Sequence, residues 1–177
     1  QYNKNIRIAL EYKAKEPRGR CYLNNTATTI LTIEETGERN CGAVLDFGHV
    51  LLGYESPAEA VALFHKYGNR LLHIHINDNY RLWDDDMIVG SVHTLEYLEF
   101  FYWLRRTAYK GWITIDQFPY REDGRDAVAE SAEWLDVLES AAERCDSEEV
   151  AAILDRRDAV AASRLMRKLL FERNMLP

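Results

Sequence analysis

Short apolar segments alternate with longer amphipathic segments along most of the chain. The apolar segments predict strands at residues 6–12, 41–46, 71–76 and 112–116. Each strand is followed, after a polar loop, by a pattern of helical period. These patterns predict helices near residues 25–35, 57–67, 94–109 and 126–144. Strands that alternate with helices in this way indicate parallel pairing and repeated βα units.

Signals at the helix ends support this division. Ser56, Pro57 and Glu59 form a capping box with proline in the first helical position, and Gly68 ends that helix. A last amphipathic helix is expected from about Asp146 to Arg173, with Glu149 in a second capping box. We therefore divide the chain into four βα units over residues 1–145 and a helical extension over 146–177.

The number of units limits the architecture. Four parallel βα units make half of an eight-stranded (βα)8 barrel, and a doubly wound open sheet is the competing α/β architecture. The strands are apolar nearly throughout, as expected when helices cover one face of the sheet and a packed core covers the other.

A potential metal ligand stands at the end of each predicted strand. These ligands are Glu11, Asp46, His75 and Asp116. A single acid at a strand end is usually a helix cap or a solvated residue, but four consecutive strands that end in this way favour a metal site. In a parallel array the carboxyl ends of the strands open on one face, so the four side chains are expected to converge. Three carboxylates and one imidazole suit a divalent cation, Mn²⁺ first and Mg²⁺, Co²⁺ or Zn²⁺ as alternatives.

A second acidic group follows the third strand. Asp84, Asp85 and Asp86 would ordinarily form a solvated turn, but they come shortly after His75. His49 lies three residues beyond Asp46, on the same side of the array. Asp84, Asp86 and His49 could therefore hold a second cation, with Asp46 as the bridge, and two such cations can clamp two substrate oxygens.

The other histidines have structural interpretations. His73 is expected in the core or beside the ligands, because it shares a strand face with His75. His65 lies inside a predicted helix, and His93 marks the start of the next one.

Composition removes several classes of function. The formal net charge is -7 and no segment concentrates basic residues, which argues against a nucleic-acid partner. No apolar run approaches the roughly 18 residues of a membrane span. Cys21, Cys41 and Cys145 are read as free thiols in a reducing compartment, so we expect a cytoplasmic protein. The first residues lack an initiator methionine and a signal-peptide core, which predicts a processed or truncated chain.

Four motifs together resemble the xylose-isomerase-like barrel superfamily, and within it most closely L-rhamnose isomerases and related aldose–ketose isomerases. The motifs are Leu10-Glu11-Tyr12-Lys13 with Glu16-Pro17, Leu45-Asp46-Phe47-Gly48-His49, His75-Ile76-Asn77-Asp78 with Asp84-Asp85-Asp86, and Ile115-Asp116-Gln117. The resemblance covers about residues 6–144 and implies the last four strands of the full barrel. The loop from His75 to Asp84 is one residue longer than the family pattern. Arg81 resembles a residue of ketose 3-epimerases, although those enzymes have a glutamate where this chain has Asp116.

The resemblance also implies roles. Glu11, Asp46, His75 and Asp116 would hold a structural metal, His49, Asp84 and Asp86 a catalytic metal, and Lys13 would lie near the oxygens of a monosaccharide. The implied reaction is aldose–ketose isomerisation by a metal-assisted hydride shift, in a protein that forms homo-oligomers. The alternatives are a ketose 3-epimerase and a non-catalytic metal- or sugar-binding fragment. A base-excision nuclease shares the fold, but the acidic charge argues against it.

Overall fold

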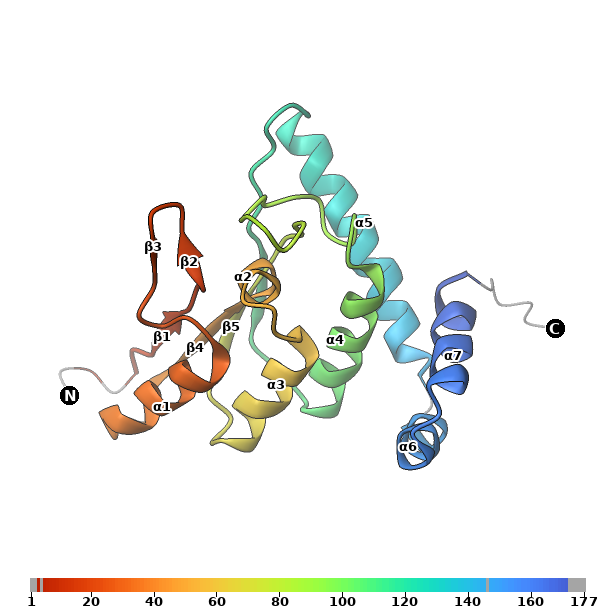
Figure 1. The fold of residues 1–177 in the computed structure, drawn as a ribbon, viewed down its shortest axis with the longest axis horizontal. Helices are drawn as coiled ribbons and strands as arrows, with labels where there is room; N and C mark the ends of the chain where they lie inside the picture. Colours follow the sequence, from red (N-terminus) through yellow and green to blue (C-terminus); the bar gives the residue numbers. More distant parts are fainter. Residues whose placement is uncertain (1–2, 4, 146, 172–177) are drawn as a thin grey trace.

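The computed structural model describes residues 3, 5–145 and 147–171 of the 177-residue chain. The four predicted strands form one parallel sheet, and they are neighbours in chain order (Figure 1). The strands are β1 (Ile8–Glu11), β4 (Cys41–Asp46), β5 (Leu71–Ile76) and β6 (Trp112–Ile115). The α/β fold of a partial barrel is therefore confirmed, and the doubly wound alternative is not needed.

A helix follows each strand, as the sequence predicts. These helices are α1 (Thr26–Thr36), α3 (Pro57–Lys66), α4 (Thr94–Arg106) and α5 (Gly124–Glu143). Local capping explains their ends: the Asn25 side chain accepts a hydrogen bond from the Thr28 amide, and Gly37 ends α1 with φ 64°. Ser56 caps α3 in the same way, through the Glu59 amide.

Two short elements near the carboxyl end of the sheet were not predicted. Strands β2 (Lys15–Glu16) and β3 (Gly19–Arg20) form an antiparallel hairpin between β1 and α1. Helix α2 (Phe47–Leu52) begins directly after β4, because the Asp46 carboxylate accepts a hydrogen bond from the His49 amide at 2.8 Å. Both elements are too short to give a clear periodic pattern in the sequence.

The prediction of one continuous C-terminal helix is wrong. The chain forms α6 (Ser147–Arg156) and α7 (Ala159–Phe171), separated at Arg157, which has φ 53°. Asp158 then accepts a hydrogen bond from the Ala161 amide at 2.9 Å and starts the new helix. The predicted start at Asp146 and end at Arg173 lie outside the described residues.

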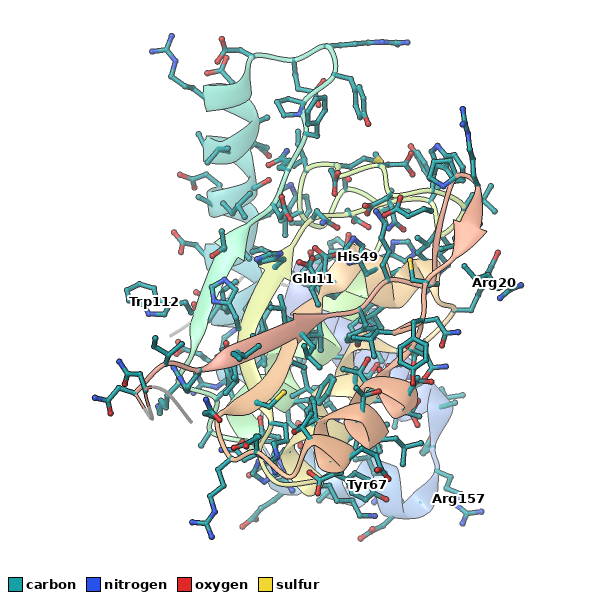
Figure 2. All side chains as sticks on the ribbon, turned by 90° about the vertical axis from the view of Figure 1, so that its left-hand side faces the viewer. Glu11, Arg20, His49, Tyr67, Trp112 and Arg157 are labelled. Carbon is teal, nitrogen blue, oxygen red and sulfur yellow. The ribbon has the colours of Figure 1, made fainter. Side chains whose placement is uncertain are left out.

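The hydrophobic core lies between the sheet and the helices. It contains Leu45, Phe64, Ile74 and Phe100, all fully buried. Figure 2 labels Glu11 and His49 close together, near the arrowhead of β1. Within the described part of the chain, β1 and β6 are the edge strands of the sheet. Among the described residues, none of the helices has the length and apolar character needed to cross a membrane.

Candidate metal centre

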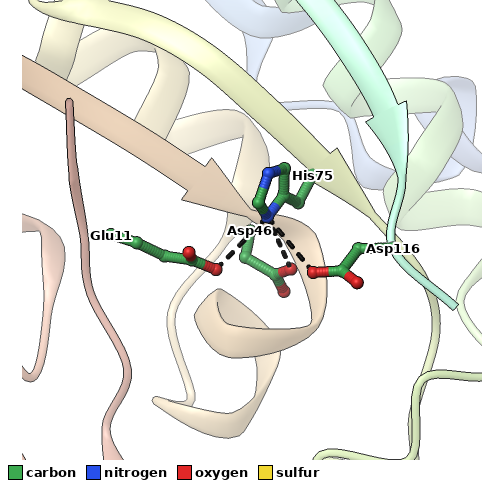
Figure 3. A group of neighbouring side chains, drawn as sticks. All are labelled: Glu11, Asp46, His75 and Asp116. Carbon is green, nitrogen blue, oxygen red and sulfur yellow. Dashed lines mark ion pairs between the residues drawn. The ribbon is translucent and has the colours of Figure 1, made fainter. Parts of the chain in front are cut away.

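Four side chains from the four parallel strands or their ends meet at the carboxyl end of the sheet (Figure 3). The His75 Nδ1 atom lies 3.3 Å from Glu11 Oε1 and 3.2 Å from Asp116 Oδ2. It lies 3.9 Å from Oδ2 of Asp46, which is 1% exposed. One ligand atom from each of the four lies within 4.8 Å of the others. The parallel sheet thus brings the four predicted ligands together.

The chemistry of this group fits a divalent cation. His75 Nδ1 is buried and makes no hydrogen bond of good geometry to any described residue, although three carboxylates surround it. Carboxylates so close together repel each other unless a positive charge lies between them. One imidazole nitrogen and three carboxylate oxygens form a donor set that suits Mn²⁺, Mg²⁺ or Zn²⁺.

The carboxylates and the imidazole of this group shift one another's pKa values. The close contact between His75 Nδ1 and the Glu11 carboxylate raises the pKa of His75, and the same contact lowers the pKa of Glu11. Burial raises the pKa of Asp46 to about 6, against the opposing charge of His49. The surrounding carboxylates therefore favour a positive charge at this point, which a protonated imidazole or a cation can supply.

A second group shares Asp46 with the first. His49 Nε2 lies 3.2 Å from Asp84 Oδ2, and ligand atoms of Asp46, His49 and Asp84 lie within 4.8 Å of one another. The other ring nitrogen, Nδ1, lies 3.1 Å from the Tyr12 carbonyl oxygen, which fixes the ring. Burial lowers the pKa of His49, but the hydrogen bond to Asp84 and nearby carboxylates outweigh burial and raise it to about 9.

Lys13 lies at the edge of this second group. Its Nζ is 2.9 Å from Asp84 Oδ2 and 3.0 Å from Glu16 Oε1. Burial disfavours the ammonium, but hydrogen bonds to the two carboxylates outweigh burial, so the pKa of Lys13 lies above its ordinary value. The other Asp84 oxygen, Oδ1, is buried without a hydrogen-bond partner among the described residues.

The structure does not bring Asp86 into the group of His49 and Asp84. Its carboxylate accepts a hydrogen bond from Asn77 Nδ2 at 3.2 Å, and its backbone has φ 47°. Burial, together with the charges of Asp84 and Asp46, raises the pKa of Asp86 to about 7. Asp86 is linked to Asp46 instead, because Asn77 Nδ2 donates to both carboxylates.

Asn77 is a site residue that the sequence reasoning missed. Its amide nitrogen donates to Asp46 Oδ2 at 3.1 Å as well as to Asp86, so it joins the shared acid to the acidic loop. Asn77 follows His75 by two residues, at the strand end where side chains alternate. This spacing of two residues from His75 was the feature of the sequence that could have identified Asn77 as a site residue.

The acidic loop is closed at its base by Asp78. This buried carboxylate accepts hydrogen bonds from the Val92 and His93 amides, and from His93 Nδ1 at 2.7 Å. Asp78 also pairs with Met87 through two backbone hydrogen bonds. His93 precedes α4 as predicted, but its ring serves this loop rather than the helix.

The remaining histidines are not members of the ligand groups, although His73 lies beside the ligand His75, as one of its two predicted positions required. His73 is half-buried rather than in the core; its ring stands edge-on to His75 at 5.1 Å, and its Nε2 lies 2.9 Å from Thr114 Oγ1. His65 is exposed in the last turn of α3.

The family described as xylose isomerase-like TIM barrel matches residues 2–138, more than three quarters of the chain. The chain belongs to this family. No curated protein matches it.

Two solved structures of sugar epimerases share the fold. A 3-keto-D-glucoside 4-epimerase from E. coli (YcjR, apo form) is 26% identical with a TM-score of 0.60, over 73% of this chain and 45% of that protein. An L-ribulose 3-epimerase is 16% identical with a TM-score of 0.64, over 86% of this chain and 52% of that protein. This xylose isomerase-like chain therefore spans about half the length of each relative.

Proposed function

We propose that this chain forms the metal-binding part of an enzyme that interconverts an aldose and a ketose. The observation that carries the proposal is the second group, His49 and Asp84, which is joined to the first group through Asp46. Isomerisation between C1 and C2 needs charge stabilisation at two neighbouring oxygens, and two adjacent cation sites can supply it. The xylose isomerase-like family supports sugar isomerisation in general.

The residues would divide the work as follows. Glu11, Asp46, His75 and Asp116 would hold one cation, and Asp46, His49 and Asp84 a second. The predicted ligand Asp86 would join the second cation only after leaving its hydrogen bond with Asn77. A bound divalent cation, with Mn²⁺ as our choice, would polarise the hydroxyl and carbonyl oxygens of the sugar. Lys13 stays charged at neutral pH and can donate a hydrogen bond to a substrate oxygen beside Asp84. Within the substrate, a hydride would pass between C2 and C1 while a proton passes between O2 and O1.

The runner-up is a 3-epimerase, because both similar structures are sugar epimerases. That reaction removes a proton from one face of a carbon and returns one to the other face. Glu11 and Asp116 approach His75 from opposite sides in Figure 3 and could act as the two carboxylates. A metal-binding protein without catalytic activity is the third candidate.

The test uses the longest polypeptide that the gene encodes, loaded with Mn²⁺ and assayed against a panel of aldoses and ketoses. Replacing Asp84 and Asp86 together by Asn should lower isomerisation by about a hundredfold or more, since the second cation site loses its ligand Asp84 and the predicted ligand Asp86. Mn²⁺ binding at the first group should remain, as counted by electron paramagnetic resonance. Asp85→Asn is the matched control, because Asp85 only accepts a hydrogen bond from the Tyr80 amide at 3.1 Å.

Three results separate the candidates. Loss of isomerisation in the double variant, with activity kept in Asp85→Asn, supports the two-cation isomerase. Near-normal turnover of the double variant, with exchange of the C3 proton into solvent, supports the epimerase. Mn²⁺ binding without turnover of any sugar supports the non-catalytic protein.

A further inference from the structure

A cavity of about 460 Å³ lies beside the metal centre and contains none of its proposed ligands. One wall is the β2–β3 hairpin, which follows β1, and the other is the segment after α2, which follows β4. The cavity therefore opens near the same end of the sheet as Glu11 and Asp46. Its lining includes Lys15, Glu16, Arg20, Asn24, Asn25 and Tyr54.

Two cations face each other in this lining. Lys15 and Arg20 are directly opposite partners in the antiparallel hairpin, so their side chains project on the same face. Like charges directly opposite each other destabilise a two-stranded ribbon. Among the residues that the structure describes, no carboxylate forms an ion pair with either one. Glu16 lines the same cavity, but its carboxylate is paired with Lys13 at 3.0 Å.

Side-chain contacts connect the lining of the cavity to the second cation group. Glu16 contacts Lys13, and Lys13 lies 2.9 Å from Asp84. On the other side, Lys15 Nζ lies 5.6 Å from the ring centre of Trp83, the residue before Asp84. A ligand with one end at the metal centre could therefore place another group in the cavity without crossing the protein core.

We propose that this cavity binds an anionic group of the substrate, a phosphate or a carboxylate, through Lys15 and Arg20. The inference rests on the proposed function and extends it, because it assigns the enzyme a sugar that carries a negatively charged substituent. A guanidinium and an ammonium on one face can share such a group, with charge-assisted hydrogen bonds from both. An anion bound by both side chains would also offset the repulsion between their like charges, although the whole chain is acidic, with net charge -7.

The first arm of the test measures the binding of inorganic phosphate to the metal-free chain by isothermal titration calorimetry. Removing the metal ensures that phosphate cannot bind to Mn²⁺. The double variant Lys15→Gln/Arg20→Gln should bind phosphate at least about tenfold more weakly. Arg18→Gln is the matched control: Arg18 is exposed in the turn of the same hairpin, does not line the cavity, and should be replaceable without effect.

The second arm compares a hexose 6-phosphate, a hexuronate and the unsubstituted hexose. Tighter binding of the first indicates a phosphate, and tighter binding of the second a carboxylate. Equal weakening by Arg18→Gln, or no saturable binding of any anion, would overturn the proposal. Mn²⁺ binding to the same variants should be unchanged, so failure of the anion site is distinguishable from failure of the metal centre.

Discussion

At the scale of single residues, Asp46 has three roles that depend on its complete burial. It belongs to both candidate cation groups, it accepts hydrogen bonds from Asn77, and it caps α2 through the His49 amide. Its burial raises its pKa to about 6, so its charge depends on the positive groups around it. Protons on the nearby imidazoles and a bound cation are therefore expected to compete as the positive charge beside the Asp46 carboxylate.

This competition predicts that Mn²⁺ binding releases protons. In the metal-free chain the pKa of His49 is raised to about 9, so its ring carries a proton near neutral pH, and the pKa of His75 is raised above its ordinary value. A metal binds the neutral imidazole, and about one to two protons per chain should leave at pH 7. Calorimetry in two buffers of different ionisation enthalpy measures this number. Lowering the pH should weaken Mn²⁺ binding, whereas an affinity independent of pH would contradict the ligand assignment.

The stability of the metal-free chain should depend on pH in the opposite direction from Mn²⁺ binding: it should be greater at lower pH. The folded-state pKa of His49 lies above its unfolded value, so the contact with Asp84 stabilises the fold fully below about pH 6.5. That contribution is lost as the pH rises through about 9. Thermal unfolding of the metal-free chain over this window serves as the control for the binding measurement.

At the scale of elements, the site depends on the close approach of α2 to the end of β5. Gly48 in α2 makes this approach possible: an added Cβ atom would lie 2.1 Å from Asn77 Oδ1 and 2.9 Å from Asn79 Nδ2. Asn79 Nδ2 in turn donates to the Gly48 carbonyl oxygen at 2.8 Å. The glycine thus lets Asn77 reach Asp46.

We expect Gly48→Ala to destabilise the chain by about 1–3 kcal/mol, because the new methyl group overpacks a buried contact. Displacement of Asn77 should also weaken Mn²⁺ binding by about tenfold or more, since an outer partner of a ligand is lost. Chemical denaturation and Mn²⁺ titration measure the two effects. Gly19→Ala is the control, because its Cβ would meet open space. Equal effects of the two substitutions would show that the packing at Gly48 is not what holds Asp46.

At the scale of the whole molecule, the sheet is open at both edges. Ile8 on β1 is 57% exposed and Trp112 on β6 is 80% exposed. Unpaired strand edges with apolar side chains favour pairing with other chains. The chain covers 45% and 52% of the two similar structures.

We therefore expect the isolated 177-residue chain to self-associate as its concentration rises. Ile8→Lys together with Ile113→Lys should shift sedimentation toward the monomer, because a charge on each edge disfavours pairing. Leu154→Lys is the control, since Leu154 is 58% exposed on α6, away from the sheet edges. A chain that stays monomeric at every concentration, or an equal effect of Leu154→Lys, would contradict this expectation.

The alternation of apolar and amphipathic segments determined much of this protein by itself. Strands β4 and β5 have the predicted bounds, because their runs are continuously apolar and end at polar loops. The order of Glu11, Asp46, His75 and Asp116 along the chain was sufficient to predict their convergence, because parallel strands place all their carboxyl ends on one face.

Only the tertiary structure decided how the second group is built. The sequence treats Asp84, Asp85 and Asp86 alike, but the loop closure at Asp78 directs Asp84 to His49 and Asp86 to Asn77. The sequence also did not predict that Lys15 lies opposite Arg20 in a hairpin, or that the C-terminal helix is interrupted at Arg157. Each feature depends on a turn of a few residues, which has no periodic pattern. Periodicity reports which face of an element is buried. Contacts between loops depend on how neighbouring elements pack, and that is set by the fold as a whole.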